Sequence, residues 1–362
     1  MGVNCGILGL PNVGKSTLFN ALTAAKAQVA NYPFCTIDPN VGIVAVPDPR
    51  LQTLAELYQP KKTTPASVEF VDIAGLVKGA SEGEGLGNKF LSHIREVSAL
   101  VHVVRCFDDP DVIHVHGAVN PAHDIDIIET ELALSDLETV LKRIDKTEKK
   151  KKTGDKTAAR EMELLLKIKT GLETGKPLKE FSPEDKGFLK EINLLTTKPL
   201  LYAANVPEKD IQTGNPWVEQ VKQIAKDKNA DCVVVSGAVE AEIASLPAEE
   251  KKEYLDELGL EESGLARLAR KAYGILNLIT FFTAGKDECR AWTIKKGTRA
   301  QQAAGEIHSD IERGFIRAEV MSCHDLFQYK TEAAVKEKGL LRLEGKEYEV
   351  QDGDIIYFRF NV

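Results

Sequence analysis

The chain has 362 residues, of which 43% are hydrophobic and 28% are charged, and its formal net charge at pH 7 is −8. This length predicts two or three domains, and the acidic balance argues against a protein whose whole surface coats nucleic acid. No apolar run approaches the ~20 residues that span a bilayer, and the first residues run straight into a strand pattern, so we expect neither a membrane protein nor a secretory leader.

A phosphate-binding loop is predicted close to the N-terminus. Residues 9–16, GLPNVGKS, fit the Walker A pattern G-x-x-x-x-G-K-[ST]. They follow an apolar strand pattern at 4–8 and precede a helical pattern, and a helix start offers unpaired N–H groups to an anion. In such a loop Lys15 reaches the outer phosphates and the Ser16 hydroxyl ligates Mg²⁺. A chance match is the alternative, but this context favours binding of a nucleoside triphosphate.

A second nucleotide-binding motif follows the strand pattern at 68–72. The pattern ends in Asp72, and Gly75 follows shortly. This is the Walker B arrangement, in which the carboxylate orders the Mg²⁺ shell and the Gly75 N–H meets the γ-phosphate. Further apolar strand patterns at 99–104, 199–204 and 232–235 are separated by helical stretches. They predict an α/β fold, with a mostly parallel sheet covered by helices on both faces.

The stretch between the strands at 99–104 and 199–204 is much longer than one crossover helix. Ile127, Leu134 and Leu141 are seven residues apart, with Leu137 and Ile144 interleaved, which is typical of a coiled-coil-like face. A second apolar set follows a Lys-rich break that contains Gly154, and consists of Met162, Leu165, Leu166 and Leu172. We therefore predict a helical coiled-coil hairpin inserted at about 122–198.

The predicted tip of this hairpin, near residues 146–156, is rich in lysine. Six lysines face only Glu148 and Asp155 as acidic neighbours; they are Lys146, Lys149, Lys150, Lys151, Lys152 and Lys156. Such a run is either a solvated helix end or a contact for a phosphate backbone.

The character of the sequence changes at residue 278. Short alternating segments at 278–283, 288–294, 315–320 and 348–360 replace the long helical patterns, and Asp352-Gly353 is a turn signal inside the last one. We predict a separate α+β domain at 278–362, after a nucleotide-binding domain at 1–277 that the hairpin interrupts.

The short motifs occur in the order of the five G motifs of GTP-binding proteins. They are the Walker A loop, Thr36 in Tyr-Pro-Phe-Cys-Thr, Asp72-x-x-Gly75, Asn205-x-x-Glu208 and Ser236-Gly237-Ala238. The Gly-rich stretch after Asp72 resembles the second switch of Obg-like proteins, and residues 350–354 with 358–360 resemble a TGS domain. Over essentially its whole length the chain closely resembles the YchF subfamily of Obg-like ATPases. The resemblance implies a P-loop, G-domain-like Mg²⁺-dependent ATPase that associates with ribosomes, with a β-grasp (TGS) domain at its C-terminus.

The motifs give a set of expected site residues. Those expected to bind nucleotide are Asn12, Val13, Gly14, Lys15, Ser16, Thr17, Gly75, Asn205, Val206, Glu208, Ser236, Gly237 and Ala238. Mg²⁺ is expected at Ser16, Thr36 and Asp72, in part through water.

The base-recognition motif departs from that of GTPases. Their Asn-Lys-x-Asp motif uses the Asp carboxylate to accept hydrogen bonds from guanine, whereas this chain has Asn205-Val206-Pro207-Glu208. Adenine lacks the donors at those positions, and Glu208 extends the carboxylate by one methylene. A site that has lost its hydrogen-bonding geometry loses its selectivity, so strict GTP specificity is not expected. The resemblance implies that ATP is preferred and that GTP is a poorer substrate.

The catalytic residues also differ from those of Ras-like proteins. Leu76 stands where those proteins place a glutamine that orients water, so either hydrolysis is slow or another side chain acts. The resemblance suggests His114 as the catalytic replacement, beside Lys15, and the alternative is that His114 is an ordinary loop residue. Asn12 is a candidate ligand for K⁺ beside the phosphates, in place of an arginine finger; the alternative is local hydrogen bonding within the loop.

The remaining candidates have weaker patterns. The seven histidines show no recognised metal spacing, and Phe281, Phe282 and Trp292 are more typical of a core than of base stacking. The six cysteines are scattered without a C-x-x-C pair, which predicts buried free thiols and a cytoplasmic protein.

The leading hypothesis is a ribosome-associated ATPase that slowly hydrolyses ATP to ADP and phosphate, as a switch in translation or stress response. The ribosome or its RNA would meet the hairpin tip and the C-terminal domain. A nucleotide-gated scaffold for RNA or the ribosome, with incidental hydrolysis, is the alternative. A small-molecule kinase is less favoured because the residues after Asp72 form a Gly-rich loop instead of an arginine-bearing lid. A monomer is the simplest state.

Overall fold

The computed structural model describes residues 4–28, 40–73, 88–114, 117–152, 156–175 and 183–361. The chain forms two compact units, one of residues 1–42 and 69–265 and one of residues 43–68 and 266–362. Two of the boundaries between these units fall inside strands, β2 (Val41–Ala45) and β4 (Ser67–Asp72), and the third falls inside helix α10 (Gly264–Ile275).

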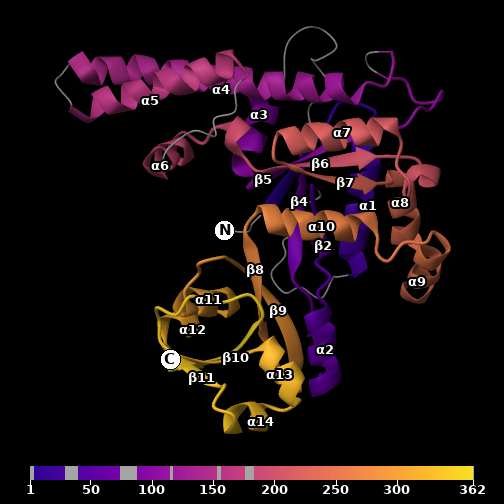
Figure 1. Ribbon diagram of the computed structural model, residues 1–362, viewed down its shortest axis with the longest axis vertical. Helices are drawn as coiled ribbons and strands as arrows, with labels where there is room; N and C mark the ends of the chain where they lie inside the picture. The colour runs from indigo at the N-terminus through magenta and orange to yellow at the C-terminus, as the bar shows by residue number, and fades with distance from the viewer. Residues whose placement is uncertain are drawn as a thin grey trace. The chain divides into compact units, whose positions relative to one another are not determined.

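The first unit is built on a six-stranded sheet with strand order β2-β4-β1-β5-β6-β7 (Figure 1). The strands from β4 to β7 pair with their neighbours in parallel. Central strand β5 is buried along its whole length, as expected when helices cover both faces of a parallel sheet. The strands are β1 (Asn4–Leu8), β2 (Val41–Ala45), β4 (Ser67–Asp72), β5 (Ala99–Arg105), β6 (Leu200–Asn205) and β7 (Asp231–Val235).

The helices of this unit pack on the sheet through apolar side chains. Val218 and Val221 of α7 join Tyr202 of β6 and Val239 of α8 in one buried cluster. The capping signals are local: the Asn215 side chain accepts from the Val218 N–H at the start of α7, where Pro216 is the first helical residue. The helices are α1 (Lys15–Gln28), α3 (Asn88–Glu96), α7 (Pro216–Asp227), α8 (Gly237–Ser245) and α9 (Ala248–Glu257), with α10 (Gly264–Ile275) at the unit boundary and short 3₁₀ turns η2 (Leu195–Thr197) and η3 (Glu208–Asp210).

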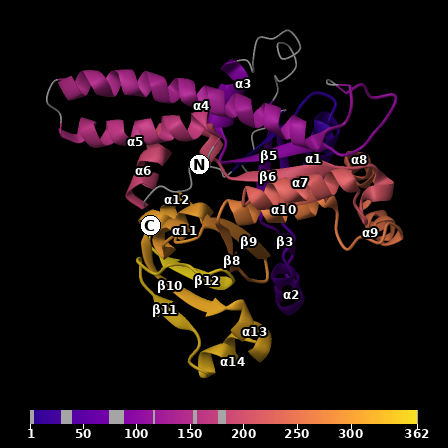
Figure 2. The same cartoon turned by 45° about the horizontal axis from the view of Figure 1, so that its top comes forward.

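The predicted helical hairpin is confirmed. Helices α4 (Pro121–Lys152) and α5 (Lys156–Glu173) run side by side, and α6 (Pro183–Ile192) follows (Figures 1 and 2). Val140 of α4 packs with Leu165 and Ile168 of α5 and with Leu189 of α6. The lysine run at 149–152 forms the exposed last turn of α4.

The predicted coiled-coil face of the hairpin is only partly correct. Leu165 is fully buried, and Ile144 and Leu172 pack against the same cluster. Leu134 and Leu141 are 54% and 41% exposed, and Leu166 of the second apolar set is 49% exposed. The buried face of α4 instead contains Ile125, Ile128, Leu132, Asp136 and Val140.

A polar anchor explains this choice of face. The Asp136 carboxylate is fully buried and accepts from the N–H groups of Leu195 and Thr196 at 2.9 and 2.8 Å, and from the Thr196 hydroxyl at 2.8 Å. These bonds satisfy the start of η2, and they turn the helix so that Leu134 points to the solvent. The hydrophobic pattern of the sequence predicts that Asp136 is exposed, because burying a carboxylate without hydrogen-bond partners costs free energy. The pattern does not show the partners that Asp136 has in the fold.

The second unit has a six-stranded sheet with strand order β11-β10-β12-β8-β9-β3. Its core joins Phe281, Phe315 and Phe358 of the strands with Ala300 and Ala304 of α11. The turn predicted at Asp352-Gly353 is confirmed, with Gly353 at φ 88°, and the strand predicted after it begins at Asp354. The strands are β3 (Lys62–Thr64), β8 (Leu278–Thr283), β9 (Glu288–Lys295), β10 (Phe315–Ser322), β11 (Arg342–Glu344) and β12 (Asp354–Phe360), and the helices are α2 (Pro49–Tyr58), α11 (Ala300–Ile307), α12 (Ser309–Arg313), α13 (Cys323–Tyr329) and α14 (Glu332–Glu337).

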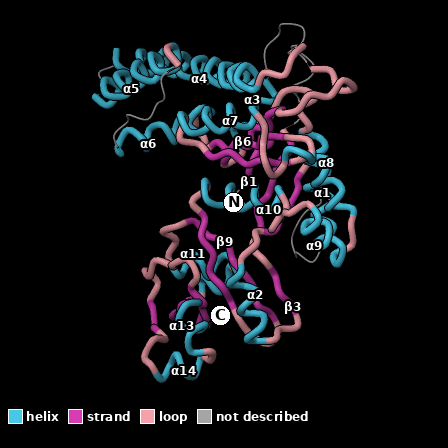
Figure 3. The backbone as a smooth tube through the Cα atoms, turned by 45° about the vertical axis from the view of Figure 1, so that its right-hand side comes forward, coloured by secondary structure: helices cyan, strands magenta, loops and turns pink. Residues whose placement is uncertain are grey.

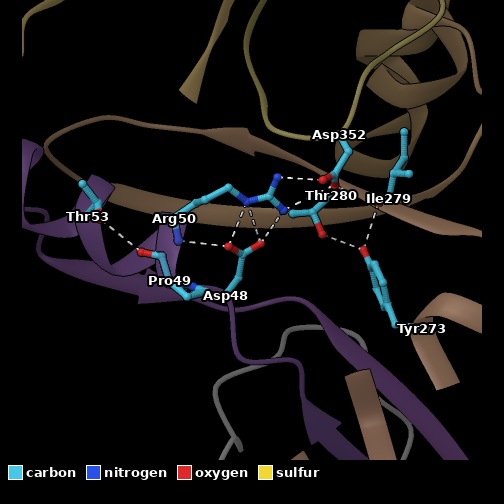
Figure 4. Close-up of polar contacts among 8 residues, drawn as sticks. All are labelled: Asp48, Pro49, Arg50, Thr53, Tyr273, Ile279, Thr280 and Asp352. Atoms are coloured by element: carbon cyan, nitrogen blue, oxygen red, sulfur yellow. Dashed lines mark hydrogen bonds and ion pairs between the residues drawn. The ribbon is translucent and has the colours of Figure 1, made fainter. Parts of the chain in front are cut away.

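Residues 43–68 belong to this second unit, which the sequence did not suggest. Strand β3 pairs in parallel with β9, and α2 packs on the same strand (Figure 3). Arg50 adds a polar link, because its guanidinium binds Asp48 and, at 2.7 Å, the carboxylate of Asp352, which in turn accepts from the Thr280 N–H at 2.9 Å (Figure 4). The hydrogen bonds to Asp48 hold the pKa of Arg50 above its ordinary value.

Candidate nucleotide-binding site

The predicted phosphate loop lies at the carboxyl edge of the first sheet. Ile7 pairs with Asp72, Arg105 pairs with Asn205, and Asn205 pairs with Val235. The segments that follow these strands therefore start at one edge, which is where open α/β sheets bind ligands. The strand register thus brings the Walker A, Walker B and base-recognition motifs to one place.

The Walker A loop has the backbone shape that a phosphate cradle needs. Gly14 has φ 88° and Asn12 has φ 60°, and helix α1 begins directly at Lys15. A Cβ on Gly14 would lie 2.1 Å from Nδ2 of Asn205, and one on Gly9 would lie 2.6 Å from the Val103 carbonyl oxygen. Both glycines are thus required sterically. The first N–H groups of α1 have no partner within the helix, so they present the positive end of its dipole to an anion.

The Lys15 ammonium forms an ion pair with Oδ1 of Asp72. Both side chains are largely covered, and the neighbouring Ser16 is exposed in the first turn of α1. The Asp72 carboxylate and the Ser16 hydroxyl are hard oxygen donors at the same sheet edge, which fits Mg²⁺. Among the described residues no group of three His, Cys, Asp or Glu side chains is arranged to hold a metal ion. Thr36, Gly75 and Leu76 lie outside the described residues.

Asn205 connects the Walker A loop to the turn before α8. Its Nδ2 donates to the Val13 carbonyl at 2.9 Å, and its Oδ1 accepts from the Gly237 N–H at 2.9 Å. The side chain is buried, so these bonds fix the spacing between the two loops. Ser236 caps α8 by accepting from the Val239 N–H.

The rest of the predicted base-recognition set is less closely grouped. The Val206 side chain is buried in the core, and its N–H donates to the Val235 carbonyl at 2.9 Å. Glu208 is exposed at the start of η3, and Thr17 and Ala238 are exposed on α1 and α8. Of the predicted set, Val13 and Gly237 are hydrogen-bonded to Asn205, Gly14 lies directly against its amide, and Thr17 lies beside Gly237.

His114 is buried next to the first turn of α4. Its Nε2 lies 3.0 Å from Oδ2 of Asp124, and the side chains of these residues are 4% and 2% exposed. Oδ1 of Asp124 is buried without a hydrogen-bond partner. The contact with the Walker A loop is made one residue earlier, where the Ile113 carbonyl accepts from Nδ2 of Asn12 at 3.1 Å.

Arg105 is a residue that the sequence reasoning missed. Its side chain is 1% exposed, and its guanidinium donates to the carbonyls of Phe107 at 3.0 Å, Asn12 at 3.4 Å and Asp109 at 3.4 Å. The sequence shows only that an arginine ends a mostly apolar strand pattern, and it does not show the carbonyls that this arginine binds.

Other sequence candidates have structural roles. Phe281 and Phe282 are fully buried, and Nε1 of Trp292 donates to the Thr283 hydroxyl at 2.9 Å, so the core interpretation is confirmed. Four cysteines are buried free thiols and Cys232 is half-buried, whereas Cys35 lies outside the described residues. In the described part of the chain, no helix combines the length and apolar character that crossing a membrane requires.

Comparison with known families identifies both parts of the chain. The model of the YchF GTPase C-terminal family, described as a protein of unknown function, matches residues 278–361, and the model of the 50S ribosome-binding GTPase family matches residues 4–153.

Individual relatives match over the full length. The "Ribosome-binding ATPase YchF" of Bacillus subtilis (strain 168) is 56% identical over 366 residues, and that of Escherichia coli O157:H7 is 54% identical over 364 residues, each covering 100% of both chains. The solved structure of the Schizosaccharomyces pombe YchF GTPase superimposes with a TM-score of 0.90 at 40% identity, and covers 99% of this chain and 98% of the other.

Proposed function

Because the chain belongs to the YchF subfamily of Obg-like ATPases, we propose that it is a ribosome-binding ATPase that hydrolyses ATP to ADP and phosphate. The observation that carries the proposal is the meeting of Lys15, Asp72 and Asn205 at one sheet edge around a glycine-shaped helix start. We propose a cytoplasmic, monomeric protein that acts as a nucleotide-dependent switch in translation or stress response.

The phosphates would be held by the main-chain N–H groups at the start of α1 and by Lys15. Lys15 is paired with Asp72, so binding of the triphosphate moves the ammonium from this carboxylate to the outer phosphates. Asp72 is then available, with Ser16 and Thr36, to orient Mg²⁺, which neutralises charge on the β- and γ-phosphates when it is bound. Gly75 is proposed to donate its N–H to the γ-phosphate.

The base would lie between the 205–208 and 236–238 segments. Asn205 keeps these segments at a fixed distance from the Walker A loop. Glu208 is exposed, and its side chain is one methylene longer than that of the Asp in the GTPase motif. Its carboxylate would therefore not accept hydrogen bonds from guanine in the way that the Asp does. This supports ATP over GTP, with Val206 contributing its main chain, because its side chain packs in the core.

Hydrolysis would be slow, with His114 as the residue that positions water. In the structure its side chain is 4% exposed and its Nε2 lies against Asp124, so the imidazole would have to become accessible before it could position water. This supports a switch whose active arrangement is formed only in part of its cycle. The same observation favours the second candidate, a nucleotide-gated ribosome or RNA scaffold with incidental hydrolysis.

The exposed lysines at 149–152 support a contact with ribosomal RNA, and we propose the C-terminal unit as a second contact.

One experiment tests these points together. Turnover of ATP and of GTP is measured with and without ribosomes, for the native chain and for a chain with Lys149 to Lys152 changed to glutamine. We expect ATP to be preferred, ribosomes to accelerate turnover, and the quadruple variant to lose ribosome binding and its salt dependence. At least tenfold tighter GTP binding would refute ATP specificity, and turnover indifferent to ribosomes would favour the scaffold. Ribosome binding that neither salt nor the quadruple variant changes would exclude the tip as the contact.

A further inference from the structure

Segment 107–114 links the Walker A loop to the hairpin. It follows β5, and its last two residues contact Asn12 through Ile113 and Asp124 through His114. A residue in this segment can act on the phosphates only if the segment is held at a fixed distance from the Walker A loop.

Arg105 binds both sides of this contact. Its Nε and Nη2 donate to carbonyls of the segment, at Phe107 and Asp109, and its Nη1 donates to the Asn12 carbonyl of the Walker A loop. The guanidinium carbon also lies 4.6 Å from the centre of the Phe107 ring, a cation–π distance. One planar group therefore sets the spacing between the loop and the segment.

The backbone of Asn12 explains why such a clamp is needed. Its φ of 60° is in the left-handed region, which a residue with a Cβ adopts less readily than glycine and keeps where its surroundings hold it. Asn12 is held at its carbonyl by Arg105 and at its side-chain amide by the Ile113 carbonyl. The first bond holds the main chain of Asn12, and the second orients the side-chain amide that was expected to lie beside the phosphates.

Burying a guanidinium costs free energy that packing alone does not recover. An apolar side chain at this position would extend the apolar β5 without that penalty. Arginine has a rigid fork with several donors that reach separate acceptors, which lysine lacks. The choice of arginine is therefore accounted for by the three carbonyls it binds.

We propose that Arg105 is a positioning residue for ATP hydrolysis. It touches no substrate, because it is fully buried, and it acts by holding Asn12 and segment 107–114 in the arrangement that the γ-phosphate meets. The inference rests on the proposed ATPase activity. It predicts that turnover depends on Arg105 much more than nucleotide affinity does.

The test uses the full chain with Arg105→Lys, Arg105→Gln and Arg105→Ala. Turnover is measured by phosphate release, affinity for ADP and for a non-hydrolysable ATP analogue by calorimetry, and folding by thermal unfolding. We expect Arg105→Gln and Arg105→Ala to lower kcat at least tenfold, with affinity changed less than threefold. Arg105→Lys should retain an intermediate kcat, and 20 mM guanidinium chloride should raise kcat of Arg105→Ala whereas 20 mM NaCl should not.

Two further measurements separate positioning from general loss of stability. Arg50→Gln removes an arginine with several hydrogen bonds from the second unit, and should lower the unfolding temperature with kcat unchanged. Hydrogen exchange over 107–114, which needs no turnover, should accelerate in Arg105→Lys and Arg105→Ala at temperatures where both are folded. Unaltered exchange, or kcat of the folded Arg105→Lys and Arg105→Ala proteins equal to that of the native chain, would overturn the proposal. A native chain without ATPase activity but with faster exchange in the variants would instead refute the proposed function and leave the clamp in place.

Discussion

Removing the Asn205 side chain should separate the Walker A loop from the turn before α8. Asn205→Ala deletes the donor to the Val13 carbonyl and the acceptor for the Gly237 N–H, both 2.9 Å bonds in a side chain that is 5% exposed. Each buried main-chain group left without a partner costs about 1–3 kcal/mol, so the loss of both bonds should destabilise the first unit by about 2–6 kcal/mol.

Asn205→Asp gives a sharper comparison. The carboxylate still accepts from the Gly237 N–H, but an oxygen now faces the Val13 carbonyl. We expect this variant to lose affinity for ATP at least tenfold, because the repulsion acts directly on the phosphate loop. The matched control is Asn215→Ala, which removes the α7 cap and a 2.8 Å bond to the Cys106 carbonyl, and should reduce stability while leaving affinity within threefold of the native value.

The assay has to report on each of the two units separately, because a chain with two units need not unfold in a single two-state transition. Hydrogen exchange read on peptides that cover 9–18 and 232–245 reports the two loops, and peptides from 278–295 serve as an internal reference. Calorimetry with a non-hydrolysable ATP analogue gives the affinity. If Asn205→Ala leaves the exchange of both loops and the affinity unchanged, the bridge does not set the geometry of the site and the reasoning fails.

Three other predictions concern histidines and the cation. His114→Ala should lower turnover while nucleotide affinity stays nearly intact; unchanged turnover would remove His114 from the mechanism. If Asn12 ligates K⁺, turnover should be higher in K⁺ than in Na⁺, and Asn12→Ala should abolish the difference; equal rates in the native chain would exclude that role. Burial lowers the pKa of His102 from 6.5 to about 3, so the unfolded chain binds more protons between these values and stability falls as the pH falls through that window. His102→Phe should reduce this acid loss by up to about 1.4 kcal/mol per pH unit, whereas His93→Gln, an exposed control, should not, and identical acid profiles in denaturant titrations would contradict the assignment.

The sequence predicted those features of the fold that depend on local chemistry. The strand before the Walker A loop, the Gly14 conformation and the Asn205 motif all follow from residue types at fixed spacing, and the structure brings them to one edge. Residues 43–68 could not be assigned in this way, since β3 joins the second unit through pairing with β9, more than two hundred residues away. Asp136 and Arg105 were missed for a related reason: a buried charge is favourable only when distant main-chain groups bind it, and no local pattern reports such partners.

The failed heptad prediction shows what decides the orientation of a helix. Leu134 and Leu141 form a regular apolar spacing, yet three hydrogen bonds to Asp136 outweigh the burial of two leucines, because breaking them would leave the start of η2 without acceptors. The same preference for satisfying polar groups governs the nucleotide edge. Asn205 fastens the Walker A loop on one side and Arg105 on the other, so the loop is held by polar bonds from β6 and β5 before any ligand binds. His114 is the exception, because its partner Asp124 keeps one buried oxygen without a hydrogen bond. Among the contacts described around the loop this one is the least satisfied, and it buries the imidazole that the proposed hydrolysis would use.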